Sequence, residues 1–162
     1  MFHVVLLLAT FLCALVAGLL FAFTVVVMPG IARLDDGGFI RAFQAIDRVI
    51  QNNHPLFMIV WVGSVLALIA ATALGASGLG GTDRLLIIVA ALLYLLCVQL
   101  PTFAINVPLN NQLQQLDPAS MNEASRKHAR ECFEPRWNKW NAIRTAAASA
   151  VSIVLMLLLM RL

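Results

Sequence analysis

The chain has 162 residues, of which 61% are hydrophobic and only 12% are charged. A soluble domain has about 45–50% apolar residues, so this composition excludes an ordinary soluble protein and indicates an integral membrane protein. The net charge of +3 is small, and the basic residues alternate with acidic ones without an aromatic platform, so nothing indicates a nucleic-acid partner.

Four apolar stretches, at about residues 4–27, 56–76, 84–105 and 139–160, each approach the ~20 residues that cross a ~30 Å hydrocarbon layer. Backbone polar groups in lipid must be satisfied internally, so we expect helices. The first stretch is too long for a signal peptide and no Lys or Arg precedes it, so we expect it to stay on the protein. The fold predicted for residues 1–162 is an all-α, single-domain membrane bundle of four helices, with two short amphipathic loop helices.

Basic residues gather on one side of this arrangement. Eight Lys or Arg residues lie between stretches one and two or between three and four, against two on the other side. The positive-inside bias therefore predicts that both large loops are cytoplasmic and both termini external, in a plasma membrane such as a bacterial inner membrane.

The first large loop is expected to carry an amphipathic helix. Met28-Pro29-Gly30 should end or bend the first spanning helix. Apolar side chains then recur at spacings of four, three and four, at Phe39, Phe43, Ile46 and Ile50. Gln44 and Asp47 occupy the remaining arc and either face solvent or reach the mouth of a pocket. His54, at the start of the second stretch, is the most interesting titratable group in this half.

The third stretch becomes polar toward its end. Gln99, Thr102, Asn106 and Asn110 follow one another at spacings of three, four and four, so they share one face of a helix. Pro101 and Pro108 remove backbone donors and leave carbonyls that a side chain, water or ligand can use. The alternative interpretation is that Asn and Pro simply terminate the helix at the membrane surface.

The sequence of the second large loop predicts another amphipathic helix. Asp117-Pro118 is a favourable helix start, and acid–base pairs four residues apart support a helix to about Phe133. Glu134-Pro135 is expected to stop this helix before the fourth stretch.

The fourth stretch opens with more polar groups than a simple anchor needs. Trp137, Asn141 and Arg144 form one helical stripe, with Trp140 beside it. Arg144 either snorkels to the headgroups as part of an interfacial anchor or faces a polar pocket within the bundle. In the second case Asn106, Asn110, Asn141 and Arg144 are expected to form one connected polar network.

The chain contains two motifs that are characteristic of a known family: Asn106-Val-Pro-Leu-Asn110 and Trp137-Asn-Lys-Trp-Asn141-Ala-Ile-Arg144-Thr145. It resembles the anthrone oxygenase-like family of small membrane proteins, long catalogued as a domain of unknown function. The Phe21-Ala-Phe23 and Met28-Pro-Gly30 turn and the Phe43-Gln44 helix also fit that pattern. The resemblance implies a four-helix fold and a candidate oxygenase that oxidises an anthrone-like compound with O2. It places the family's recurrent amide, tryptophan and arginine positions at Asn106, Asn110, Trp137, Asn141 and Arg144.

The chemistry of such a reaction assigns candidate roles. An anthrone enolate reduces O2 without a metal, so its site needs a base and oxyanion donors. Arg144, Asn141 and Asn106 are the candidate donors, and His54, Asp47 or His128 is the candidate base. The candidate substrate-binding residues are Asn110, Trp137, Trp140, Gln99, Phe43 and Gln44.

No metal and no cofactor other than O2 as co-substrate is expected. The expected partners are the lipid bilayer and a lipophilic small molecule, and the formation of a homo-oligomer is left open. Two rival functions remain: a binding or transport module without chemistry, and a haem or metal redox protein. The latter is disfavoured because His3, His54 and His128 lack ligand spacing.

The predicted orientation can be tested at Cys132, which lies in the second large loop. We expect an impermeant thiol reagent to label Cys132 only after the cytoplasmic side is opened, because the loop lies inside the cell. Labelling of Cys132 in intact cells would reverse the orientation.

Overall fold

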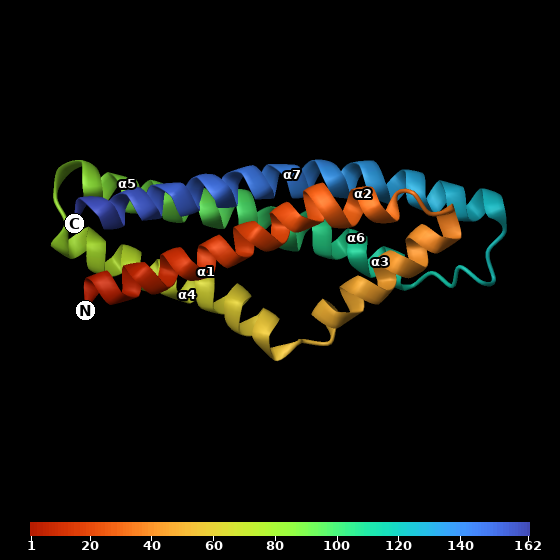
Figure 1. The fold of residues 1–162 in the computed structure, drawn as a ribbon, viewed down its shortest axis with the longest axis horizontal. Helices are drawn as coiled ribbons and strands as arrows, with labels where there is room; N and C mark the ends of the chain where they lie inside the picture. The colour runs from red at the N-terminus through yellow and green to blue at the C-terminus, as the bar shows by residue number, and fades with distance from the viewer.

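The computed structural model describes all 162 residues and contains helices without strands. Four continuous helical segments are long and apolar enough to cross a membrane: Phe2–Ile31, Pro55–Gly78, Gly81–Gln114 and Glu123–Arg161. The predicted all-α, four-helix fold is therefore confirmed, and the chain is an integral membrane protein in contact with the lipid bilayer. Both termini and the α4–α5 turn lie at the same end of the molecule (Figure 1).

The first segment joins α1 (Phe2–Ala22), the π-helix η1 (Phe23–Val27) and α2 (Met28–Ile31). Pro29 does not end this segment. It has no N–H to donate to the carbonyl one turn earlier, which lies within η1, and the wider π-helical turn accommodates the missing hydrogen bond. The segment is roughly 45 Å long, at about 1.5 Å per residue, so it extends beyond a ~30 Å hydrocarbon layer.

The amphipathic helix predicted in the first loop is α3 (Asp36–Gln51). Asp35 caps it by accepting a hydrogen bond from the Gly38 N–H. The helix folds back toward the membrane segment, and a sharp corner joins it to α4 (Pro55–Gly78), so that the two helices form a V (Figure 1). Asn53 in this corner has a φ of 56°, a left-handed conformation that asparagine tolerates better than most residues.

The third segment is irregular where the sequence becomes polar. It consists of α5 (Gly81–Tyr94), the π-helices η2 (Leu95–Gln99) and η3 (Thr102–Asn106), and α6 (Val107–Gln114). Pro101 lies between the two π-helices, and Pro108 lies in the first turn of α6. The prolines therefore change the type of helix without ending it.

The fourth segment is α7 (Glu123–Arg161), a single continuous helix. The prediction of a separate helix from Asp117 to about Phe133 is therefore wrong. Asn122 caps its first turn by accepting from the Ser125 N–H at 2.8 Å, whereas Asp117 accepts from the Ala119 N–H and forms a turn. Pro135 lies inside α7 and does not stop it. The carbonyl of the exposed Glu131, one turn earlier, loses a donor, and water can replace that donor. The second amphipathic helix is thus the first half of α7.

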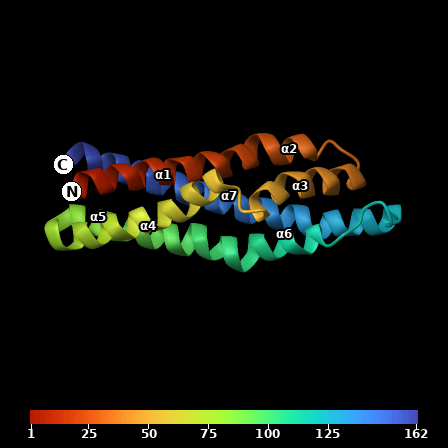
Figure 2. The ribbon, with the colours of Figure 1, turned by 90° about the horizontal axis from the view of Figure 1, so that it is seen from below.

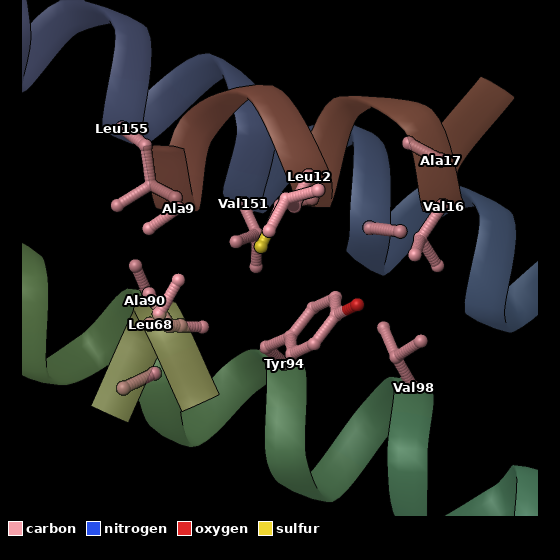
Figure 3. Packing of buried hydrophobic residues seen from close by; sticks show 14 of the residues in the cluster. Ala9, Leu12, Val16, Ala17, Leu68, Ala90, Tyr94, Val98, Val151 and Leu155 are labelled. Carbon is pink, nitrogen blue, oxygen red and sulfur yellow. The ribbon is translucent and has the colours of Figure 1, made fainter. Parts of the chain in front are cut away.

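Two apolar cores are stacked along the molecule. The larger one, between α1, α4, α5 and α7, lies within the membrane segments; Figure 3 shows Leu12, Leu68, Tyr94 and Val151 of these four helices pointing toward one another. The smaller one is aromatic and contains Phe39, Phe43, Phe133 and Trp137. It is built by α3 with the ends of the long segments, which run alongside it (Figure 2). A site between the two cores is enclosed by helices on several sides.

The depth of this junction follows from helix geometry. Arg161 forms an ion pair with Asp83 at 3.0 Å, at the end where the termini lie. Arg144 precedes Arg161 by 17 residues on the same helix, or roughly 26 Å along its axis. In a ~30 Å hydrocarbon layer that begins at Arg161, Arg144 lies close to the opposite boundary.

Candidate functional site

A cavity of about 310 Å³ lies at the junction of the two cores. It is bounded by α1 and η1, the end of α3, the start of α4, η3 with α6, and the middle of α7. Its lining is mostly apolar and comprises Leu19, Leu20, Phe23, Phe43, Asp47, Ile50, Gln51, Asn53, Phe57, Met58, Trp61, Val62, Thr102, Phe103, Asn106, Val107, Asn110, Trp137, Asn141 and Arg144. This volume and the few polar groups within apolar walls are typical of small-molecule sites.

Arg144 supplies the positive charge of the cavity and is only 4% exposed. One terminal nitrogen donates to the Thr102 hydroxyl at 2.9 Å and the other to Asn141 Oδ1 at 2.9 Å. Its Nε–H has no partner, and none of the four ion pairs in the structure includes Arg144. A buried cation without a counter-ion is costly, and an anionic ligand would offset that cost.

The two partners of Arg144 are themselves held in place. The Thr102 hydroxyl donates to the Val98 carbonyl at 2.6 Å, so its oxygen lone pairs are available to Arg144. The Asn141 amide donates to the Leu20 carbonyl at 3.1 Å and to the Thr24 hydroxyl at 2.8 Å. The guanidinium is therefore fixed by η3 on one side and by α1 and η1 on the other.

Asp47 supplies the negative charge and is 3% exposed. Its Oδ1 accepts from the Asn110 amide at 2.8 Å. Its Oδ2 accepts from the Gln51 amide at 2.6 Å and from the Gln114 amide at 3.0 Å. These three neutral donors stabilise the carboxylate and hold α3 against α6.

Trp137 lies between the charged groups. Its ring N–H donates to Asn110 Oδ1 at 2.7 Å, and its ring centre is 5.8 Å from the Arg144 guanidinium carbon. The rings of Phe23 and Phe43 lie 5.6 and 5.5 Å from it and complete an aromatic wall. Asn106 donates to the Trp137 carbonyl at 3.4 Å, while its own side-chain oxygen is buried without a partner.

The four residues expected to form one polar network all line the cavity, but their hydrogen bonds form two groups. Arg144 and Asn141 belong to the first group with Thr102, and Asn106 and Asn110 belong to the second with Trp137 and Asp47. No hydrogen bond joins the groups across the cavity. Both groups line the cavity, so a ligand there would lie between them, whereas the unpaired Nε–H of Arg144 and the unpaired oxygen of Asn106 are themselves enclosed by protein atoms.

Comparison with known proteins bears on this arrangement. The sequence model described as anthrone oxygenase matches residues 47–154, which is two thirds of the chain. The chain belongs to the anthrone oxygenase family. No curated protein and no solved structure matches it. The matched region of this family member begins at Asp47 and includes Asn106, Asn110, Asn141 and Arg144, the polar residues of the cavity.

Seven of the candidate residues line the cavity, and five do not. The seven are Arg144, Asn141, Asn106, Asp47, Asn110, Trp137 and Phe43. Trp140 is half-buried outside the cavity, and Gln99 is buried closer to the membrane core, without a cavity contact. Gln44 donates to the carbonyls of Leu113 and Leu116 at 2.8 and 2.9 Å and ties α3 to the end of α6.

The histidines lie away from the cavity. His54 is exposed and directly precedes α4 without a side-chain hydrogen bond to it, and exposed His128 contacts Cys132 on α7 at 3.6 Å. His3 is also exposed, at the N-terminus. The structure contains no group of three His, Cys, Asp or Glu side chains placed to hold a metal ion. Among the candidate bases, only Asp47 lines the cavity.

Sequence reasoning missed several residues that line the cavity or form hydrogen bonds to its polar side chains. Gln51 lies one turn after Asp47 and Gln114 one turn after Asn110, so helical spacing could have indicated them. Thr24, Phe57 and Trp61 had no local signal, because their roles arise only when separate helices come together.

The structural role of Gln44 can be tested by replacing it with Ala. This change removes two hydrogen bonds between α3 and the end of α6 and takes the side-chain donor from the partly buried Leu116 carbonyl, so we expect the free energy of unfolding to fall by about 1–3 kcal/mol. The exposed Gln112, changed to Ala, is the matched control and should have little effect. Unfolding in detergent micelles measures both, and equal stability of the two variants would contradict the assigned role.

Proposed function

We propose that this protein is an oxygenase that oxidises a flat, lipophilic ring compound of the anthrone type with O2. The observation that carries the proposal is one apolar cavity with a buried arginine, free of any carboxylate partner, and a separate buried aspartate. In the proposed reaction, anthrone and O2 give anthraquinone and water. The ring carbon loses both hydrogens, one oxygen atom becomes the new carbonyl, and the other leaves as water.

The walls of the cavity suit a flat ring system. Phe23, Phe43 and Trp137 form one wall. On α4, the rings of Phe57 and Trp61 are stacked with centres 5.5 Å apart and planes 18° from parallel. Aromatic side chains bind flat apolar molecules through large contact areas and defined stacking geometry.

Arg144 is suited to stabilise the enolate oxygen of the substrate. Loss of a C–H proton from an anthrone places negative charge on its carbonyl oxygen, and the Arg144 guanidinium, which lines the cavity, is a fixed cation that stabilises that charge. Thr102 and Asn141 hold the guanidinium before substrate binds, so little reorganisation is needed. Asn106 also lines the cavity, and rotation of its amide group would let its unpaired oxygen accept a hydrogen bond from a phenolic O–H on the substrate.

Asp47 is suited to take the proton. Its carboxylate accepts the first C–H proton, and the electron pair left on the substrate reduces O2 to give a carbon-bound peroxide. Loss of the second C–H proton then breaks the O–O bond and forms the new C=O bond. The leaving oxygen atom takes up both protons as water, and Asp47 returns to its carboxylate form.

Replacing Arg144 with Gln tests the oxyanion assignment. We expect turnover of an anthrone in vesicles, followed as O2 uptake, to fall by ~10²–10³, because one preorganised donor is lost. Arg136, which is exposed on the same helix, is the matched control and changing it to Gln should leave turnover unaltered. Parent-level turnover in a folded R144Q variant would show that Arg144 only anchors the helix. A parent protein that binds anthrone without O2 uptake would favour a binding or transport module.

Replacing Asp47 with Asn tests the base. The variant keeps the shape of the side chain but lacks a carboxylate, so we expect turnover to fall by ~10²–10⁴. Binding of anthraquinone, measured by quenching of tryptophan fluorescence, should persist, because Trp61 and Trp137 still line the cavity. Turnover of D47N at the parent rate would show that Asp47 is not the base and only accepts hydrogen bonds from its three amide partners.

A further inference from the structure

One opening of the cavity lies between α4 and η3, and the exposed lining residues Gln51 and Asn53 mark another at the α3–α4 corner. Val62 of α4 and Phe103 of η3 both line the cavity, yet they are 43% and 64% exposed. A side chain that lines a cavity and is also exposed on the outer surface lies at the rim of an opening. Because Val62 and Phe103 belong to different helical segments, the opening lies between those segments.

The packing of the helices explains why this opening exists. The main packing partners of α4 are α1 and α5, whereas those of η3 are α6 and α7. The turn between α4 and α5 keeps these helices together at one end, while the start of α4 diverges toward the α3–α4 corner (Figure 1). The two segments therefore flank the cavity, and each packs mainly on other elements.

The surface around the opening is apolar and lies within the membrane-spanning segments. On α4, Ile59 and Leu66 are 63% and 62% exposed, and on the third segment Leu96 and Leu100 are each 57% exposed. Exposed apolar side chains on membrane-spanning helices face lipid, because they are more stable in hydrocarbon than in water.

We propose that the cavity takes its substrate directly from the bilayer through this opening, and that its substrates are ring compounds carrying a hydrocarbon chain. This inference rests on the proposed function. The ring system occupies the cavity between Arg144 and Asp47, and the chain extends past Val62 and Phe103 into the lipid. A chain that stays in lipid needs no room in a cavity of about 310 Å³.

The first experiment locates the opening and does not depend on activity. A nitroxide is attached at Val62→Cys in protein whose three native cysteines are replaced, and the protein is placed in phosphatidylcholine vesicles. We expect O2, which concentrates in lipid, to relax the nitroxide more than a water-soluble nickel chelate does. A nitroxide at Leu66→Cys gives the lipid reference, and one at Gln112→Cys gives the water reference. Val62 behaving like Gln112 overturns the proposal.

The second experiment compares two ligands at equal mole fractions in the bilayer: anthraquinone, and an anthraquinone that carries a dodecyl chain. The parent protein should bind the two with affinities within about threefold, because the chain remains in lipid. Val62→Trp should weaken binding of the dodecyl compound by about tenfold or more by crowding the opening, and should change anthraquinone binding much less. Leu66→Trp, one turn further along the lipid-facing side of α4, is the matched control and should alter neither affinity.

The outcomes separate this proposal from the proposed function. If the parent binds anthraquinone but rejects the dodecyl compound, the opening does not admit a chain and the inference is overturned, while the oxygenase proposal stands. If the parent binds neither compound, the substrate class falls together with the proposed function, and the nitroxide measurement still decides whether the opening faces lipid. If Val62→Trp and Leu66→Trp weaken binding equally, Val62 does not border the path of the chain, and the inference is overturned.

Discussion

The burial of the Arg144 guanidinium is the constraint on which the site depends. A cation in an apolar environment requires polar partners, and here they are neutral: the Thr102 hydroxyl and the Asn141 amide. Each partner is fixed in turn by backbone carbonyls, at Val98 and Leu20. The charge itself is not neutralised by a carboxylate. The guanidinium therefore still favours an anion in the cavity. A buried ion pair with a carboxylate would have cancelled this preference.

The stacking of the two cores determines where a buried guanidinium can find polar partners. Without α3, the membrane-spanning segments would expose Asn106 and Asn110 at a water interface. Here α3 folds back against the protruding ends of the first, third and fourth segments, and its aromatic residues Phe39 and Phe43 close a second core. That second core shields Asn106 and Asp47 from water and brings Asp47 to the same cavity as Arg144. The helix α3, which lies outside the membrane-spanning segments, therefore completes a site whose other residues lie on those segments.

Much of the fold and part of the site could be predicted from sequence because both depend on helical spacing. Apolar length indicated four spanning helices, and spacings of three and four indicated that Asn141 and Arg144, like Asn106 and Asn110, share a face. His54 and Asp47 both belong to the stretch that leads into the second spanning helix, which makes each a candidate base, but the corner at Asn53 leaves His54 exposed outside the cavity. The amide partners of Asp47 come from two helices, and pairing between α3 and α6 leaves no local pattern. Pro135 was expected to break a helix, yet Phe133 and Trp137 on either side of it are held in the aromatic core.

The set of donors around Asp47 has a further consequence for proton traffic. Its three partners are amides of Asn110, Gln51 and Gln114, and no amide gains or loses a proton in the physiological pH range. These hydrogen bonds give the carboxylate no relay to bulk water. The proposed reaction requires none, because both hydrogens removed from the ring carbon leave as part of one water molecule. Over a full cycle the site neither releases nor takes up a proton, so an oxygenase of this design can work on a substrate supplied from lipid without a proton channel across the protein.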